Sequence, residues 1–342
     1  MKIIIDAMGG DNAPQEIVRG AVDAQSEFGV DIILVGREDE VKKCLADCGA
    51  EDNLHITVAD APDVIEMCDD PTSVVTTKKH CSMAVALGLL RDGAGDACIS
   101  AGNTGALLSG ATLIVKRIRG IRRAALAPAL PNGGSGALLI DCGANAECTA
   151  ELLLQFAYMG SFYSQSVLGC ESPRVGLLNI GAENNKGTAL SREVHALLTE
   201  AGASGRINFI GNIEPTAIME NGADVVVADG FSGNIFLKTL EGAAAFVMRS
   251  VKGVFYSGVK GKLAGALIAS ELKGLKSQLS VSEYGGTALL GISKPVIKAH
   301  GGSNARAIRS AVKQAIAFVQ AGVTDEITRN IEFMKVKDEK NV

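Results

Sequence analysis

The feature that most constrains the fold is a regular alternation of short apolar runs with longer stretches of helical periodicity. Several of the runs are apolar at every position, which is typical of strands that are covered on both faces. This alternation predicts an α/β fold, a doubly wound, Rossmann-like and mostly parallel sheet. The predicted strands are Lys2–Ile5, Asp31–Val35, His55–Val58, Ala97–Ser100, Ala137–Asp141, Val175–Asn179, Ile207–Ile210, Val225–Ala228 and Pro295–Lys298. The predicted helices are Gln15–Glu27, Thr76–Leu90, Glu147–Ser166, Ser191–Ala201 and Ala305–Ala321.

Glycine is unusually frequent, at 40 of 342 residues, where the average share is about 7%. Many of these glycines follow the predicted strands, where they would allow tight turns and a close approach of backbone N–H groups to a ligand. In doubly wound sheets, ligands bind at the carboxyl ends of the strands. The sequence therefore predicts a binding cleft formed by these turns.

Composition and charge exclude several classes of protein. The formal net charge is −5, from 33 basic and 38 acidic residues, which argues against general nucleic-acid binding. The uncharged stretches Ala97–Val115 and Leu152–Cys170 contain several polar residues, so we expect them to be buried parts of a soluble protein. The N-terminus reaches Asp6 too early for a signal peptide. Eight cysteines without a C-x-x-C pair indicate reduced, mostly buried thiols of a cytosolic protein and no metal site.

We expect one large catalytic unit over residues 1–330, followed by a charged, flexible tail over 331–342. Within this unit, Ser250–Leu279 interrupts the alternation, because it contains no predicted strand and places apolar residues on one helical face. It is predicted to be a protruding helical hairpin that contacts either the core or a dimer partner, or binds an anionic membrane surface reversibly. The expected membrane contacts are Lys260, Lys262, Leu263 and Leu267.

Polar residues recur in the turns that follow the predicted strands. Amide, hydroxyl and backbone donors in such turns suit a phosphate-like anion and can polarise a carbonyl group. Neither G-x-G-x-x-G after the first strand nor a G-x-S-x-G elbow is present, so dinucleotide binding and serine hydrolysis are weakly supported. The alternative for each turn is ordinary helix capping or, for the lone His300, a structural role. The candidate ligand-binding residues are Asp6, Gly9, Gly10, Asp11, Ser100, Asn103, Thr104, Asn145, Lys186, Asp229, Asn234, His300, Ser303 and Asn304.

These turns together resemble one protein family. The motifs are D-A-M-G-G-D-N-A-P (6–14), S-A-G-N-T-G-A (100–106), D-C-G-A-N (141–145), N-I-G-A-E-N-N-K-G (179–187), G-N-I-E (211–214), D-G-F-S-G-N (229–234), Y-G-G (284–286) and H-G-G-S-N (300–304). In this order they are similar to the bacterial phosphate acyltransferases of phospholipid synthesis. The resemblance implies a phosphotransacetylase-like fold and a cytoplasmic homodimer. It also implies formation of acyl phosphate from acyl-(acyl carrier protein) and inorganic phosphate, without a cofactor. The product would pass to a membrane glycerol-3-phosphate acyltransferase, which favours a peripheral membrane contact.

For this reaction, direct attack of phosphate on the thioester is expected. Asn103, Thr104 and Lys186 are predicted to hold phosphate, while Asn145 and Asn234 polarise the carbonyl group. His300 would transfer a proton or bind phosphate, and Asp229 would orient a partner. Docking of the acidic carrier is predicted at a basic stretch, the alternative being a solvated helix C-terminus: Lys116, Arg117, Arg119, Arg122 and Arg123. The competing functions are a coenzyme A-dependent phosphate acetyl- or butyryltransferase, a non-catalytic membrane-associated scaffold and, third, a dehydrogenase.

Overall fold

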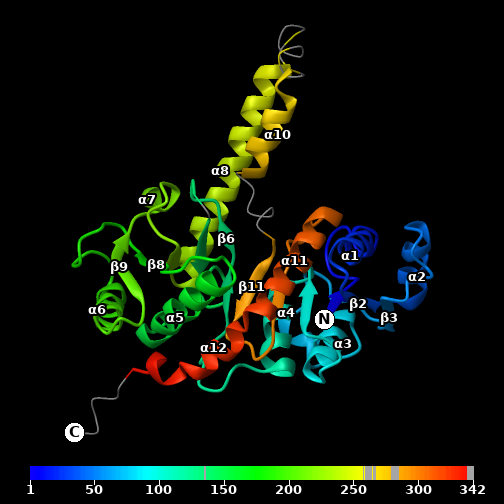
Figure 1. Ribbon diagram of the computed structural model, residues 1–342, viewed down its shortest axis with the longest axis horizontal. Helices are drawn as coiled ribbons and strands as arrows, with labels where there is room; N and C mark the ends of the chain where they lie inside the picture. The colour runs from blue at the N-terminus through cyan, green and yellow to red at the C-terminus, as the bar shows by residue number, and fades with distance from the viewer. Residues whose placement is uncertain (135, 257, 259–263, 265–266, 279–284, 337–342) are drawn as a thin grey trace.

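The strands of the protein form two sheets that share their helical layers. The computed structural model describes residues 1–134, 136–256, 258, 264, 267–278 and 285–336. The larger sheet has seven strands in the order β3-β2-β1-β4-β12-β11-β5, and the smaller has five in the order β6-β7-β10-β8-β9 (Figure 1). Most neighbouring strands are parallel, whereas β5 and β12 pair antiparallel with β11, and β6 pairs antiparallel with β7.

The element bounds are as follows. The strands are β1 (Lys2–Asp6), β2 (Asp31–Gly36), β3 (Ile56–Asp60), β4 (Ala97–Ser100), β5 (Ala125–Ala127), β6 (Ala129–Leu130), β7 (Ala137–Ile140), β8 (Arg174–Leu178), β9 (Asn208–Ile213), β10 (Val225–Val227), β11 (Thr287–Leu290) and β12 (Val296–Lys298). The α-helices are α1 (Gln15–Phe28), α2 (Glu38–Asp47), α3 (Ser82–Arg91), α4 (Thr104–Gly110), α5 (Ala150–Ser166), α6 (Ala189–Ala203), α7 (Pro215–Met219), α8 (Gly230–Tyr256), α10 (Ala269–Gln278), α11 (Ala305–Ala321) and α12 (Val323–Arg329).

Both faces of the seven-stranded sheet are covered by helices. Ile3 and Ile5 of β1 pack into one fully buried layer with α1 and α11, and Ile4 packs into the opposite layer with α3 and α4. Helices α1 and α11 cross closely at Gly20, where a Cβ atom would lie 2.5 Å from the carbonyl oxygen of Ala305. The prediction of strands that are apolar at every position because both faces are buried is confirmed here.

The chain passes between the two sheets at Pro128. This residue separates β5, at the edge of the larger sheet, from β6, at the edge of the smaller sheet. The two edges remain joined, because the backbone N–H of Leu126 donates to Asp141 (2.9 Å) and that of Cys142 donates to the Leu126 carbonyl (3.2 Å). The carboxyl ends of β4 and β12 in one sheet and β7 and β10 in the other therefore face a common cleft.

The predicted strands are all present within three residues of their expected bounds. The sequence patterns did not predict α2, β11 or the short, alanine-rich strands β5 and β6. The helix predicted over Thr76–Leu90 begins only at Ser82, because the preceding turn is held by Lys78, whose Nζ donates to Asp69 (2.6 Å) and to the Val64 carbonyl (3.0 Å).

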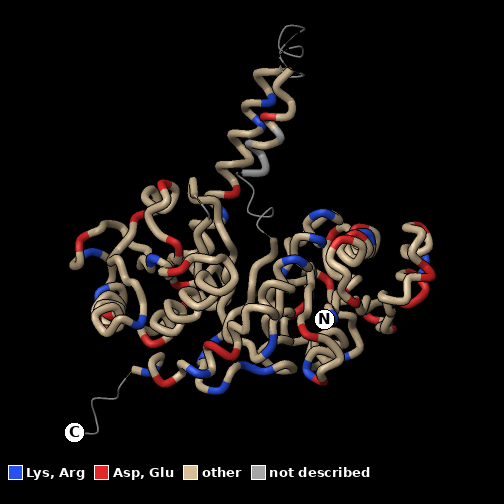
Figure 2. Tube along the Cα trace, viewed as in Figure 1, with Lys and Arg blue, Asp and Glu red and all other residues tan. Residues whose placement is uncertain are grey.

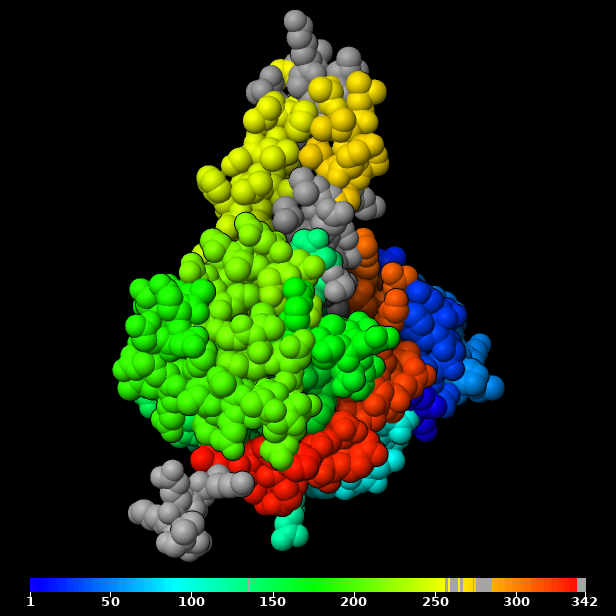
Figure 3. Space-filling view, turned by 60° about the vertical axis from the view of Figure 1, so that its left-hand side comes forward, coloured from blue at the N-terminus to red at the C-terminus, as the bar shows by residue number. Residues whose placement is uncertain are grey.

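The segment Ser250–Leu279 is helical where it is described. Helix α8 starts already at Gly230, within the main body, and extends to Tyr256, while α10 lies beside its outer half. In Figures 1 and 3 the two helices project away from the sheets. Of the predicted membrane contacts, Lys260, Lys262 and Leu263 lie outside the described residues, and Leu267 is 77% exposed.

The two uncharged stretches are mostly buried elements of the fold, with Leu113 and Leu168 as exposed exceptions. Ala97–Val115 contains β4, α4 and a short π-helix (Ala111–Val115), and Leu152–Cys170 contains most of α5, whose Phe156 and Tyr163 are fully buried. Among the described residues, no helix combines the length and hydropathy needed to cross a bilayer. The first residues of the predicted tail are folded, because Ile331–Met334 form a 3₁₀ helix in which Met334 is fully buried. Residues 337–342 lie outside the described residues.

Candidate active site

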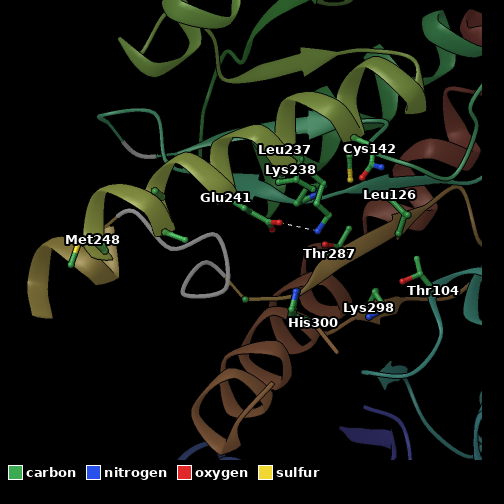
Figure 4. Close-up of a pocket in the computed structure, with 16 residues that line it drawn as sticks. Thr104, Leu126, Cys142, Leu237, Lys238, Glu241, Met248, Thr287, Lys298 and His300 are labelled. Atoms are coloured by element: carbon green, nitrogen blue, oxygen red, sulfur yellow. Dashed lines mark hydrogen bonds and ion pairs between the residues drawn. The ribbon is translucent and has the colours of Figure 1, made fainter. Parts of the chain in front are cut away.

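A cavity of about 470 Å³ lies in the cleft between the two sheets (Figure 4). One face of α8 forms one wall, and the carboxyl end of β12 with the start of β11 forms the opposite wall. Its lining residues are Thr104, Leu126, Pro128, Cys142, Asn234, Leu237, Lys238, Glu241, Ala244, Ala245, Met248, Gly285, Gly286, Thr287, Lys298 and His300. The α8 residues recur at intervals of three and four, so a single helical face borders the cavity.

The two walls bring basic side chains to the same space. Lys238 projects from α8, and its Nζ lies 2.8 Å from Oε2 of Glu241 one turn further along the helix. Lys298 ends β12 on the other wall and is only 9% exposed, and its Nζ donates to the adjacent Ala299 carbonyl. Burial, with a contribution from the charge of Lys238, lowers the pKa of Lys298 to about 8. The third basic side chain is His300, which follows β12.

Behind Lys298 the ends of β1 and β4 form a buried polar network. The hydroxyl group of Ser100 donates to Oδ2 of Asp6 (2.7 Å) and accepts from the backbone N–H of Gly102 (3.1 Å). Asp6 is 1% exposed, and burial raises its pKa. Gly9 is required here, because a Cβ atom would lie 2.7 Å from the Gly102 nitrogen. The network therefore fixes the strand ends on which the cavity wall is built.

The turn after β1 and the turn after β12 are bound to each other. The backbone N–H of Asp11 donates to the Gly301 carbonyl (2.8 Å), and the Asn12 amide donates to the Ser303 carbonyl (3.1 Å). The Ser303 hydroxyl donates to the His300 carbonyl (2.6 Å). The structure thus brings together two turns that are nearly 300 positions apart in sequence, as the sheet model predicted. Gly10, which adopts a positive φ of 109°, lies in the same contact, and Asn304 caps α11.

On the smaller sheet, the fully buried Asp141 organises the turn after β7. Its carboxylate accepts hydrogen bonds from the backbone N–H groups of Leu126, Cys142, Ala144 and Asn145 and from the Asn145 amide. The Asn145 amide also donates to the Ala124 carbonyl (2.8 Å). Both amide hydrogens are engaged in this way, so Asn145 positions the turn in this structure, and its predicted role at the substrate carbonyl stays a prediction.

Helix α8 carries Asn234 into the cavity. Asp229 caps this helix, because its carboxylate accepts from the backbone N–H (2.7 Å) and the hydroxyl group (2.9 Å) of Ser232. The Asn234 amide lies against Gly143 and has no hydrogen-bond partner among the residues that the structure describes. Asn234 is thus placed as a donor or acceptor for a ligand, whereas Asp229 has a structural task at the helix start.

Of the three predicted phosphate ligands, only one lines the cavity. Thr104 lines the cavity, but Asn103 behind it caps α4 through Ala106 and donates to the Met67 carbonyl (3.0 Å). Lys186 lies outside the cavity, beyond β8, where it is exposed and 3.9 Å from Glu183. The cations that border the cavity are instead Lys238 and Lys298, which the turn motifs did not single out. A charged residue at the end of the buried apolar strand β12 was the available signal for Lys298, and a spacing of four from Asn234 was the signal for Lys238.

The basic stretch from Lys116 to Arg123 leads into β5, at the end of that strand that lies away from the cavity. Arg117 pairs with Ile292, beyond the end of β11, whereas the first residue of that strand, Thr287, lines the cavity. The stretch follows the short π-helix and lies at the lower edge of the molecule in Figure 2. Arg122 is ion-paired with Glu151 (2.6 Å). Arg123 stands only three positions before Leu126, which lines the cavity, a span of about 10 Å along an extended strand, so docking of the carrier at this stretch stays a prediction.

No group of three or more His, Cys, Asp or Glu side chains that could hold a metal ion occurs in the described part of the chain. The cysteines are unpaired, and Cys142 in the cavity wall is buried. Burial raises the pKa of the Cys142 thiol well above its usual value, which makes it a poor nucleophile.

Comparison with known proteins shows the family and the fold of the chain. The chain is 47% identical over 341 residues to a phosphate acyltransferase of Oceanobacillus iheyensis, covering 99% of this chain and 100% of the relative. It is 43% identical over 342 residues to that of Clostridioides difficile, covering 100% and 99%. Its fold resembles a phosphotransacetylase from Streptococcus pyogenes (TM-score 0.63, 19% identity, 94% of each chain) and a branched-chain phosphotransacylase from Enterococcus faecalis (TM-score 0.56, 15% identity, 93% and 99% coverage). The family model described as fatty acid synthesis protein matches residues 1–326. The chain therefore belongs to the fatty acid synthesis protein family, together with relatives named phosphate acyltransferases.

Proposed function

We propose that the protein transfers a fatty acyl group from the thioester of acyl carrier protein to inorganic phosphate, for phospholipid synthesis. The observation that carries this proposal is the composition of the cavity. Lys238, Lys298 and His300 offer basic groups at one part of it, and the α8 face continues outward as an apolar strip. Such a site accepts an anion and an apolar chain together, as the two reactants require.

The apolar strip consists of Ala244, Ala245 and Met248, beyond the ion pair of Lys238 and Glu241. From Ala244 to Met248 it extends about 6 Å, at 1.5 Å per residue of helix. An apolar surface of this length supports an acyl chain longer than an acetyl group. Small side chains at positions 244 and 245 leave room for methylene groups between the helix and the opposite wall.

The reaction needs no covalent enzyme intermediate. A phosphate oxygen attacks the carbonyl carbon, the new C–O bond forms, and the C–S bond breaks as the thiolate leaves with its electron pair and takes a proton. A thiol with a pKa near 8.5 is a good leaving group. In this proposal Asn234 donates to the carbonyl oxygen, where one such donor contributes about 3–4 kcal/mol to the transition state. His300 supplies the proton or binds phosphate.

The test is formation of acyl phosphate by the purified protein from inorganic phosphate and matched acyl donors. Activity with palmitoyl-(acyl carrier protein) well above that with palmitoyl-coenzyme A or acetyl-coenzyme A is expected. Preference for a coenzyme A thioester would favour a phosphate acetyl- or butyryltransferase. The absence of turnover with every donor would revive the non-catalytic scaffold.

Docking of the carrier at the basic stretch is tested by the variant Arg122→Glu. We expect the KM for the carrier to rise in this variant, and to depend strongly on salt in the wild type, since charged contacts between surfaces weaken with ionic strength. An unchanged KM would place the docking site elsewhere.

We further propose a cytoplasmic homodimer that contacts the membrane peripherally through the projecting helices and passes its product to a membrane glycerol-3-phosphate acyltransferase. Phe246 is 64% exposed on α8, and Leu267 is 77% exposed. Large exposed apolar side chains at this density are typical of a contact surface. In sedimentation with anionic liposomes, we expect the wild-type protein in the pellet. A variant that combines Leu267→Glu with charge reversal of Lys260 and Lys262 should stay in the supernatant. Unchanged sedimentation, together with dissociation of the dimer, would assign the surface to the subunit interface alone.

A further inference from the structure

We propose that Lys298 and Lys238 together form the phosphate-binding element of the cavity, with Lys298 as its principal cation. The inference rests on the proposed function and names the residues that bind its anionic substrate. It replaces the predicted role of Lys186 with two lysines from opposite walls of the cavity.

The first argument is that Lys298 is a buried cation without an ion-pair partner among the described residues, since Asp11 and Asp6 attract its charge only from beyond contact distance. Its ammonium group carries three N–H donors, and one of them is used by the neighbouring Ala299 carbonyl. Among the described residues no carboxylate lies within 4.0 Å of its Nζ to form an ion pair. Burying a charge is costly unless it is paired and hydrogen-bonded. An anion bound at the remaining donors would remove this cost.

The second argument is the arrangement of like charges. Lys238 faces Lys298 across the cavity, close enough to depress the pKa of Lys298. Two ammonium groups that face each other repel without a ligand, whereas a phosphate dianion between them is attracted by both. Glu241 neutralises the charge of Lys238 only in part. The Lys238 side chain of this ion pair is largely exposed, so solvent screens the attraction.

The third argument is access to the rest of the site. Thr104 and His300 border the same space and can complete the hydrogen bonds of a phosphate group.

Lys298 is rigidly placed, since it ends β12 beside Ser100 of β4 in the parallel register. The charged and titratable groups that face Lys298 are Lys238 and Glu241 from α8, Asp6 and Asp11 from β1 and its turn, and His300 after β12.

The pH dependence follows from the same geometry. Lys298 carries its charge below a pKa of about 8, so phosphate binding should weaken as pH rises through that value. Removal of the like charge in Lys238→Ala should raise the pKa of Lys298 and move this loss to higher pH. A merely structural lysine would produce no such shift.

The experiment measures the KM for inorganic phosphate and, independently, phosphate binding by calorimetry, for wild type, Lys298→Met, Lys238→Ala and the exposed control Lys313→Ala on α11. Methionine keeps the length of the side chain, and circular dichroism checks folding. We expect Lys298→Met to raise the KM for phosphate and its dissociation constant by about tenfold or more, the loss that follows from one charged hydrogen bond. The KM of this variant for the acyl carrier should stay within about twofold of the wild-type value. Such a change corresponds to much less free energy than the loss of one charged hydrogen bond.

Three outcomes overturn the inference. The first is an unchanged phosphate KM in Lys298→Met, above all if Lys186→Ala raises it instead. The second is a rise only in the KM for the carrier, which would assign the lysines to the phosphodiester of its pantetheine arm. The third, should Lys298→Met fail to fold, is a wild-type phosphate affinity that does not decline through pH 8. If wild type binds phosphate as expected but transfers no acyl group, the proposed function fails and the phosphate site stands.

Discussion

Replacement of Gly233 by alanine is expected to destabilise the protein through one contact at the start of α8. An added Cβ atom would lie 2.0 Å from the carbonyl oxygen of Asp141 and 3.1 Å from its carbonyl carbon. Neither Gly233 nor Asp141 can shift easily to relieve this contact. Asp141 is fully buried and accepts from four backbone N–H groups, and Gly233 is itself bonded to the Asp229 carbonyl (2.9 Å).

The magnitude follows from two opposing effects. Overpacking of a rigid site costs about 1–3 kcal/mol, and this contact is severe enough for the upper part of that range. Exchange of glycine for alanine within a helix contributes about 1 kcal/mol of stability. Gly242, also on α8, offers a matched control, because nothing lies within 4 Å of its added Cβ atom. The helix gain is common to both variants, so their free energies of unfolding should differ by about 1–3 kcal/mol.

Urea unfolding followed by far-UV circular dichroism measures this difference, since the chain contains no tryptophan. Gly242→Ala should unfold at a higher urea concentration than wild type, and Gly233→Ala at a lower one. Gly233→Ala should also lower kcat, because Asn234 is its direct neighbour. If both variants were stabilised equally and Gly233→Ala kept full kcat, the close approach of α8 to the turn after β7 would be refuted.

Three further predictions concern other parts of the fold. Burial alone would raise the pKa of Asp224, but the hydrogen bonds and charge of Arg174 (2.9 Å) outweigh it and lower that pKa; Asp224→Asn should therefore cost about 1–3 kcal/mol at pH 7. Because the folded pKa is the lower one, this difference between wild type and variant should shrink as pH falls below about 4 and through the folded pKa, and an equal difference in urea unfolding at pH 7 and pH 3 would contradict the ion pair. Asn103→Ala should lose about 1 kcal/mol of stability as the cap of α4 with little change in the KM for phosphate, whereas Thr104→Val should raise that KM; the reverse pattern would return Asn103 to the binding site. Ala245→Phe should narrow the apolar strip, so activity should fall with long-chain and persist with short-chain acyl carriers, and an unchanged chain-length profile would place the acyl chain elsewhere.

Local patterns were sufficient to predict the order of most strands and helices and the meeting of the turns that follow β1 and β12. The apolar run Lys2–Ile5 and the run Ala97–Ser100 indicated strands because their physical cause, burial on both faces, acts over a few residues. The contact between Asp11 and Gly301 followed from the same logic, because parallel strands bring their carboxyl ends to one edge. The helix α11 was predicted with its observed bounds for a similar reason, since its cap Asn304 and its apolar spacing are local.

The division into two sheets depends on contacts that no local pattern records. The short strands β5 and β6 are rich in alanine, a residue that favours helices, and they are strands only because β11 and β7 pair with them. The same holds for hydrogen-bond partners. Asn103 and Asn145 carry amide groups that the sequence suggests for ligand binding, yet these amides donate to the carbonyl groups of Met67 and Ala124, which are distant in sequence.

What the sequence alone determined, then, is the succession of strands, helices and glycine-rich turns, and through the resemblance of those turns, the family. The tertiary structure decided which polar side chains face the cavity. Lys298 and Lys238 lie 60 positions apart, on a strand and a helix whose separate patterns are ordinary. They become neighbours because α8 packs across the cleft from β12, and the strength of an electrostatic site depends on such distances and on burial, neither of which is a property of any single segment.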